Sequence, residues 1–241
     1  MTTALISDVH ANLEALEVVL KAIDERGVRH ILCLGDVVGY GASPNECLKL
    51  VRDRCEIVLL GNHDSAASGG PEAARFNPNA RAAALWTAKT LTPEQRDYLR
   101  GLSLSQRVDL FLCVHASPAA PRDWEYIFDR FDAEPQFQFF SEPACFIGHT
   151  HQPAIFERSS SGCVFVPPTR LRFEAARRYI VNVGSVGQPR DRDPRACFLV
   201  LHDGSGEIEY VRVPYDVDGA QERIRAAHLP EVLATRLATG E

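Results

Sequence analysis

The sequence predicts an α/β fold in which two β-sheets pack face to face and helices cover them. Two observations indicate this class. In residues 1–64, short apolar runs typical of buried strands alternate with amphipathic helical segments. In residues 154–213, strand-like runs follow one another with only turns between them, a pattern typical of antiparallel pairing. Two packed sheets with helices outside are the simplest arrangement that buries all of these strands.

The N-terminal part contains two strand–helix–strand units. Strands are expected at residues 2–7, 31–34 and 57–60. The first helix follows Asn12, which can cap it, and the second follows Ser43, which is expected to form a capping box with Glu46. Each unit has the length of a parallel βαβ unit. The carboxyl ends of the three strands should therefore lie along one edge of a sheet, where ligand sites gather.

The remaining elements follow from the same patterns. Residues 65–105 are expected to form a helical insertion with helices at 80–89 and 93–100; it could act as a lid, although plain scaffold is the simpler interpretation. The strands from residue 154 onward are expected to form an antiparallel second sheet. Further strands are expected at residues 111–114, 144–147, 154–157, 163–166, 179–183, 197–201 and 208–213, before a helical segment at 216–239. Because no linker or low-complexity segment interrupts the chain, residues 1–241 are expected to form a single domain.

Composition argues against several classes of protein. The chain has 26 Lys and Arg against 32 Asp and Glu, a net charge of −6, and no long basic run, so a nucleic-acid partner is not expected. The apolar N-terminal run is too short for a signal peptide, and no apolar run approaches the roughly 20 residues of a membrane helix. The 7 cysteines form no Cys-x-x-Cys pair and are expected to be buried free thiols in a reducing cytoplasm. A homo-oligomer remains open.

Metal chemistry is predicted by polar residues at the ends of the expected strands. His149 and His151 are two positions apart after an apolar run, so both imidazoles can face one place. Further carboxylate, amide and imidazole side chains follow the other strands. The full set is Asp8, His10, Asp36, Asn62, His63, His115, His149 and His151. Seven of these eight, all but His63, suffice for two ions about 3.5–4 Å apart if one Asp bridges them.

The types of ligand restrict the metal and the substrate. Imidazole with carboxylate suits Mn, Fe, Zn or Co rather than Ca or Mg, and the residues alone do not choose among these metals. Two divalent ions with Asp8 and Asp36 leave a net positive site that attracts phosphate. Such a pair of ions also lowers the pKa of a bridging water towards about 7, so that hydroxide can attack phosphorus in line. His63 is then the candidate general acid or phosphate-oxygen donor, with Asp64 placed to orient it.

Five motifs, taken in order, resemble those of the calcineurin-like metallophosphoesterase superfamily, and within it the small bacterial and archaeal phosphodiesterase-like members. They are Asp8-Val9-His10, Gly35-Asp36, Gly61-Asn62-His63-Asp64, His115 and Gly148-His149-Thr150-His151. The resemblance implies a four-layer α/β/β/α sandwich of two mixed sheets and a dinuclear hydrolase. It also implies that Asp36 bridges the two ions and that Asn62 and His63 contact the substrate. One ion would be held by Asp8, His10, Asp36 and His151, and the other by Asp36, Asn62, His115 and His149.

Two departures from the resemblance bear on the substrate. Ser/Thr protein phosphatases of this superfamily have an Arg before the Gly-Asn-His-Glu motif and an Asp-Arg-Gly after the bridging Asp. Here Leu60 precedes Gly61, and Gly39-Tyr40-Gly41 occupies the loop after Asp36. A phosphodiester or small phosphomonoester substrate is therefore favoured. A phosphoprotein phosphatase and a non-catalytic metal-binding scaffold remain alternatives. Substitute cations could come from Arg75, Arg81, Arg122 or Arg190, each of which is also explained as an ordinary surface arginine.

Overall fold

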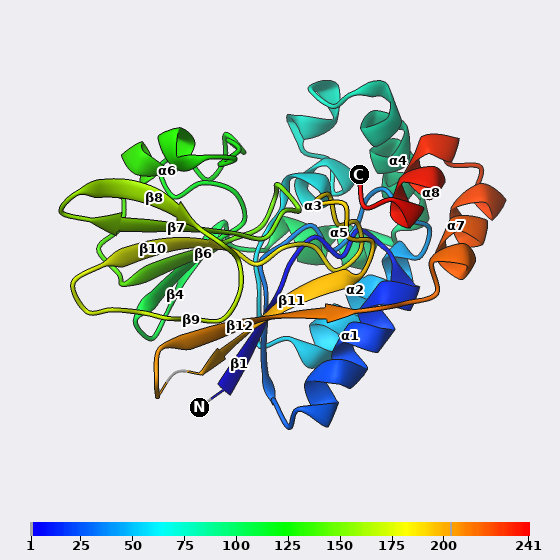
Figure 1. Ribbon diagram of the computed structural model, residues 1–241. Helices are drawn as coiled ribbons and strands as arrows, with labels where there is room; N and C mark the ends of the chain where they lie inside the picture. Colours follow the sequence, from blue (N-terminus) through cyan, green and yellow to red (C-terminus); the bar gives the residue numbers. More distant parts are fainter. Residues whose placement is uncertain (1, 203) are drawn as a thin grey trace.

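The computed structural model describes residues 2–202 and 204–241, which form two six-stranded mixed sheets (Figure 1). The first sheet has the order β3-β2-β1-β11-β12-β9 and the second the order β4-β5-β6-β10-β7-β8. The strands of the first sheet are β1 Thr2–Ile6, β2 His30–Cys33, β3 Ile57–Val58, β9 Leu171–Arg172, β11 Ala196–His202 and β12 Glu207–Val213. Those of the second are β4 Ser105–Val108, β5 Phe111–Val114, β6 Ala144–Ile147, β7 Ala154–Ser159, β8 Gly162–Val166 and β10 Arg178–Asn182.

The two expected βαβ units are confirmed. Strands β1, β2 and β3 run parallel and are joined by α1 (Leu13–Glu25) and α2 (Pro44–Arg54). The Asn12 side chain caps α1 by accepting from the Ala15 backbone N–H. The expected capping box at Ser43 is wrong, because its side chain makes no cap hydrogen bond. In a capping box the Ser43 backbone N–H would donate to the Glu46 side chain. Here it donates to the Ala11 carbonyl instead.

The later strands do not form a separate antiparallel sheet, so that expectation is also wrong. Strands β11 and β12 join the first sheet, where β11 pairs antiparallel with β1. Strands β7, β8 and β10 join the second sheet, where β10 runs parallel to β6. The pattern of apolar residues along a strand reports which faces are buried, and it contains no information on which strand lies alongside.

Three apolar layers hold the sandwich together and confirm the four-layer α/β/β/α architecture. Between the sheets, Leu5 and Leu199 of the first pack in one cluster with Phe146 and Val181 of the second. The outer face of the first sheet packs against α1 and α2. The outer face of the second is covered by α6 (Arg130–Gln136), beside it in Figure 1, with Phe137 in their shared cluster.

Phe146→Ala tests the inter-sheet core. Phe146 is 0% exposed and contacts the rings of Phe111 and Phe173. Its truncation leaves a cavity that neither sheet can close, so we expect a loss of about 3–5 kcal/mol in the free energy of unfolding measured in urea. The control is Phe165→Ala on β8, where the ring is 53% exposed and the expected loss is smaller than about 1.5 kcal/mol. Equal losses in the two variants would contradict this packing.

Helices cluster around the carboxyl edge of the first sheet. The expected helices of the insertion are present: α4 (Pro78–Thr90) and α5 (Pro93–Arg100), after the short α3 (Asn62–Ala67) and a 3₁₀ turn, η1 (Pro71–Ala74). The C-terminal segment forms α7 (Val217–Ala226), α8 (Glu231–Thr235) and a final 3₁₀ turn, η2 (Arg236–Ala238). Figure 1 shows α4 beside α7 and α8, and the three share an apolar cluster that includes Tyr40.

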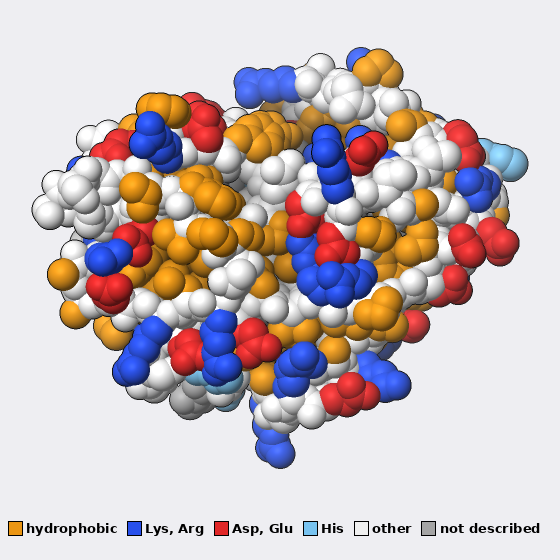
Figure 2. All heavy atoms as spheres, in the orientation of Figure 1, with side chains coloured by type: hydrophobic (Ala, Val, Ile, Leu, Met, Phe, Trp, Pro, Cys, Tyr) orange, Lys and Arg blue, Asp and Glu red, His pale blue; other side chains and the backbone are white. Residues whose placement is uncertain are grey.

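The surface in Figure 2 has Lys and Arg side chains interspersed with Asp and Glu, without a broad basic area on that face. Within residues 2–202 and 204–241, no helix combines the length and apolar character needed to cross a membrane. All 7 cysteines are free, and six of them are buried.

Candidate metal centre

The turns that follow five strands bring the predicted ligands together. Asp8 and His10 follow β1, Asp36 follows β2, and Asn62 begins α3 just after β3. His115 follows β5 of the second sheet, and His149 and His151 follow β6. Both sheets therefore contribute at the edge where their parallel strands end. Each of the seven side chains is at most 6% exposed, so the group lies inside the protein rather than on a solvated face.

The side chains form two adjacent groups of possible metal ligands. Asp8, His10 and His151 make one triad, and Asp36, His115 and His149 make the other, with the donor atoms of each within 4.8 Å of one another. The Asp36 Oδ2 atom lies 3.3 Å from His115 Nε2 and 3.6 Å from His10 Nε2. One carboxylate oxygen therefore lies between the two triads, which is the arrangement that a bridging ligand requires.

Backbone carbonyls fix which nitrogen each histidine presents. The Nδ1 atoms of His10, His115 and His151 donate to the carbonyls of other loops. The distances are 3.2 Å to Val38 O, 3.0 Å to Leu34 O and 2.6 Å to Gln188 O, respectively. A carbonyl can only accept, so Nδ1 carries a proton in each of these rings and Nε2 is the nitrogen that faces the centre. His149 is reversed, because its Nε2 donates to Trp124 O at 2.9 Å and leaves Nδ1 free.

Unpartnered polar atoms show that this donor set fits a cation. Asp8 Oδ1 and Asn62 Oδ1 are buried and have no hydrogen-bond partner among the described residues. Each such atom costs about 1–3 kcal/mol when left unsatisfied. Burial also lowers the pKa of His10 and His151 well below the usual range, so both are neutral, which is the form of imidazole that binds metals. Nitrogen and oxygen donors in this combination suit a divalent transition metal.

The backbone at the centre is strained. Asp8, His10, Asp36, His149 and His151 all have φ between 49° and 68°, the left-handed region. For residues with a side chain this conformation costs roughly 1–2 kcal/mol each. Two glycines allow the close approach of neighbouring turns: a Cβ at Gly61 would collide with Asp36 Oδ1, and one at Gly148 would collide with Ser7. Strain concentrated in five of seven candidate ligands is typical of a site held in place for function.

Metal binding is expected to release a proton. Burial alone would lower the pKa of His115, but the neighbouring Asp36 and Asp8 carboxylates outweigh it and raise the pKa to about 9. His115 is therefore protonated at pH 7 in the metal-free protein, and it must lose that proton to offer Nε2 to an ion. Calorimetric titration with Mn²⁺ in buffers of different ionisation enthalpy should report release of about one proton or more. A heat that is independent of the buffer would contradict the pKa assigned to His115.

His63 lies beside the ligands without being needed among them. Its ring stacks on Phe76 at 4.5 Å between centroids and contacts Tyr40 at 4.3 Å. The His63 backbone N–H donates to Asp36 Oδ1 at 2.8 Å, which fixes its distance from the triads. The His63 Nδ1 atom is buried and unpartnered, and burial lowers the pKa of the ring to about 4.

The structure gives Asp64 hydrogen-bond partners other than the His63 ring that it is expected to orient. The Asp64 oxygens accept from the backbone N–H groups of Val38 at 3.0 Å and Gly61 at 3.2 Å. At the third position of α3, the Asp64 side chain accepts from the backbone N–H at the start of the helix. Asp64 therefore braces the loops that hold Asp36 and Asn62, while aromatic rings position His63.

Comparison with known proteins identifies the fold family. A model described as the calcineurin-like phosphoesterase superfamily domain matches residues 1–205. The chain belongs to this superfamily.

Three relatives give the extent of the similarity. An uncharacterized protein of Methanocaldococcus jannaschii is 39% identical over 241 residues, which covers 98% of this chain and 97% of the relative. A crystal structure of a metallophosphoesterase from Sphaerobacter thermophilus is 41% identical, with a TM-score of 0.90 over 100% of this chain and 99% of that chain. A symmetrical bis(5'-nucleosyl)-tetraphosphatase of Actinobacillus pleuropneumoniae is 36% identical over 67 residues, 27% of this chain and 25% of that enzyme. The protein is accordingly a phosphoester hydrolase of a family that depends on divalent metals.

On one side of the centre, the calcineurin-like domain presents exposed aromatic side chains. Tyr126 stacks on His149 at 4.1 Å between centroids, and Phe128 stacks on Tyr126 at 5.1 Å. Tyr126 is 48% exposed and Phe128 55%. Residues 124–131 are rich in aromatic side chains, but nothing in their sequence indicates that the Trp124 carbonyl orients His149. Every residue has a backbone carbonyl, so no residue type marks the one that binds a histidine ring.

The arginines considered as substitute cations are dispersed in this phosphoesterase. Arg75 and Arg122 line a separate cavity of about 390 Å³ together with Trp124. Arg81 is exposed on α4. Only Arg190 adjoins the centre: its backbone N–H donates to His151 O at 3.2 Å, and its guanidinium lies 5.5 Å from the centroid of the Tyr40 ring.

Proposed function

We propose that the protein is a dinuclear metal-dependent phosphoesterase that hydrolyses phosphodiester or small phosphomonoester substrates. The observation that supports it most strongly is the position of Asp36 Oδ2 between two triads of buried ligands whose histidine rings are oriented by backbone carbonyls. We assign one ion to Asp8, His10, Asp36 and His151 and the other to Asp36, Asn62, His115 and His149. Manganese is the first choice of metal, with Fe, Zn, Co or Ni as substitutes.

The metal ions and the protein side chains would have different roles in the reaction. Two divalent ions held there would act as Lewis acids on the phosphoryl oxygens and bring the pKa of a nearby water towards about 7. Asp36 would hold both ions, and the burial of all seven ligands excludes bulk water from the centre. The burial of His63, which lowers its pKa to about 4, makes it neutral at rest and able to donate a hydrogen bond to a phosphoryl oxygen. A bound phosphate dianion would raise that pKa and allow His63 to protonate the leaving oxygen.

The loop after Asp36 supports a small substrate over a phosphoprotein. In the place of the Asp-Arg-Gly of protein phosphatases, Tyr40 packs its ring against His10 and His63, at 4.7 Å and 4.3 Å. The symmetrical bis(5'-nucleosyl)-tetraphosphatase that matches 67 residues of this chain acts, by its name, on bis(5'-nucleosyl) tetraphosphates, which are small phosphorylated molecules.

Free cysteines throughout the core also lead us to infer a cytoplasmic location.

The substrate class is tested by steady-state kinetics with Mn²⁺. We expect kcat/KM for bis-p-nitrophenyl phosphate or p-nitrophenyl phosphate to exceed that for a phosphoserine peptide by at least about tenfold, a difference of about 1.4 kcal/mol in transition-state binding. Preference for the phosphopeptide would support the protein phosphatase. Bound metal with no hydrolysis of any of the three would support the non-catalytic scaffold.

A further inference from the structure

We propose that Arg190 and Arg236 form a subsite for a second phosphate group of the substrate, next to the phosphate that is hydrolysed. The inference rests on the function proposed above for the same centre. It assigns a role to two side chains that take no part in holding the metals.

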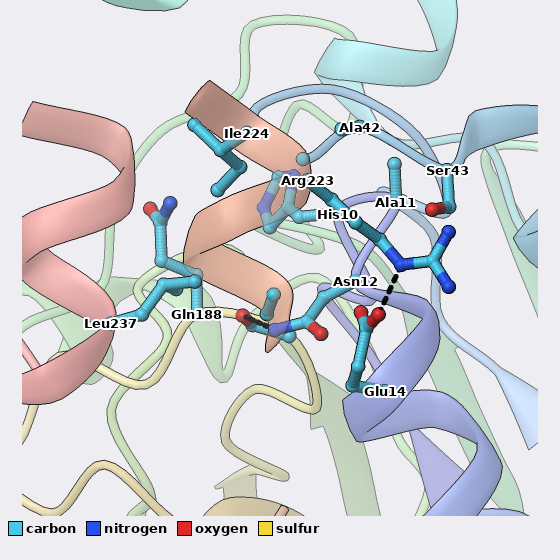
Figure 3. A pocket seen from close by; sticks show the side chains of 13 residues that line it. His10, Ala11, Asn12, Glu14, Ala42, Ser43, Gln188, Arg223, Ile224 and Leu237 are labelled. Carbon is cyan, nitrogen blue, oxygen red and sulfur yellow. Dashed lines mark hydrogen bonds and ion pairs between the residues drawn. The ribbon is translucent and has the colours of Figure 1, made fainter. Parts of the chain in front are cut away.

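The two guanidinium groups are held side by side by one amide. The Gln188 Oε1 atom accepts from Arg190 Nη2 at 2.7 Å and from Arg236 Nη1 at 3.3 Å. The Gln188 backbone carbonyl accepts from His151 Nδ1 at 2.6 Å. Gln188 therefore connects the arginine pair directly to a candidate metal ligand. Figure 3 shows Gln188 beside Leu237, the residue that follows Arg236, at a cavity of about 10 Å³ that has room for about one water.

The positive charge of the pair is not neutralised. Neither arginine forms an ion pair within residues 2–202 and 204–241, and the Nε atom of each is buried with no hydrogen-bond partner there. Burial and the neighbouring Arg190 lower the pKa of Arg236. Other arginines nearby are paired: Arg223 with Glu14, as Figure 3 shows, and Arg225 with Glu231. Two adjacent unpaired charges destabilise the fold unless an anion is bound between them.

The position of the pair suits a substrate that extends beyond the metals. The Arg190 guanidinium lies over the Tyr40 ring, and that ring contacts His10 and His63 on the centre. The pair is thus next to the centre but separated from it by one aromatic ring. Arg236 lies in η2, outside residues 1–205 that match the superfamily domain, so the C-terminal helices add this charge to the common fold.

Phosphate is the anion that fits two guanidinium groups. Each guanidinium can give two parallel N–H donors to phosphate oxygens, and an Arg–phosphate pair is stronger than a neutral hydrogen bond. A substrate with two neighbouring phosphates, as in a phosphoanhydride, could place one at the metals and the other at Arg190 and Arg236. The subsite would select such compounds over simple monophosphates.

The test compares two inhibitors of bis-p-nitrophenyl phosphate hydrolysis at a fixed free Mn²⁺ concentration. Methylenebisphosphonate has two anionic groups and methylphosphonate has one. The affinity of the Mn²⁺-loaded protein for each is also measured by calorimetry, which does not require turnover. The variants are Arg190→Gln and Arg236→Gln, with Arg236→Lys to keep the charge. Arg225→Gln is the control, because that arginine is already paired with Glu231.

We expect the ratio of the two affinities to fall about tenfold in each Gln variant, to fall less in Arg236→Lys, and to stay unchanged in Arg225→Gln. A ratio that stays constant in Arg190→Gln and Arg236→Gln would overturn the subsite. Parallel weakening of both inhibitors leaves the ratio constant and would place the arginines on the hydrolysed phosphate instead. If no ester is hydrolysed but calorimetry shows the fall in the ratio, the subsite stands and the proposed hydrolysis fails.

Discussion

Asp36→Asn is expected to lower kcat/KM for bis-p-nitrophenyl phosphate by about a thousandfold and to reduce the number of bound Mn²⁺ ions below two. Asp36 Oδ2 lies 3.6 Å from His10 Nε2 and 3.3 Å from His115 Nε2, between the two triads. Burial alone would raise the pKa of this carboxyl, but His115 and His63 outweigh it and hold the pKa well below its usual range. The negative charge is therefore present at every working pH, and the amide removes it at nearly constant shape.

The measurement is steady-state kinetics together with metal analysis after gel filtration. Asp53→Asn serves as the control, because Asp53 lies on the surface of α2 in an ion pair with Lys49. Wild-type turnover and two bound ions in Asp36→Asn would show that Asp36 is not the bridge.

His63→Ala is expected to reduce kcat by about a hundredfold to ten-thousandfold while the metal content stays at the wild-type level. The backbone N–H that holds Asp36 remains in this variant, so the ligands keep their support. If His63 protonates the leaving oxygen, the loss should be larger for phenyl phosphate than for p-nitrophenyl phosphate, whose leaving group needs no proton. His30→Ala is the control, since the partly exposed His30 ring is not among the candidate ligands and hydrogen-bonds to Glu56 through Nδ1.

Equal losses for the two leaving groups would indicate that His63 binds a phosphoryl oxygen without transferring a proton. No loss with either substrate would remove His63 from the mechanism.

Much of the fold and of the candidate site could be predicted from the sequence because both depend on local patterns. The alternation of apolar strands with amphipathic helices is enough to place Asp8, Asp36 and Asn62 on one edge. The helix cap at Asn12 also follows from residue type and spacing. The partners of the later strands could not be predicted, because β10 and β11 have similar apolar patterns but join different sheets.

The parts of the site that could not be predicted depend on contacts between distant segments. The Asp64 carboxylate binds a loop 26 residues away, and no local pattern distinguishes this from a contact with its neighbour His63. The Trp124 carbonyl and the Gln188 carbonyl orient two histidines through main-chain atoms that have no sequence signature. Arg236 approaches Arg190 only because the C-terminal helices pack beside α4.

The central claim is that two ions share Asp36. The most direct measurement is a crystal structure of the Mn²⁺-loaded protein with anomalous scattering at the manganese edge. We expect two peaks about 3.5–4 Å apart, with Asp36 Oδ2 within bonding distance of both. The remaining contacts are expected from Asp8, His10 and His151 on one ion and from Asn62, His115 and His149 on the other. A single peak, or two peaks that do not share Asp36, would contradict the account.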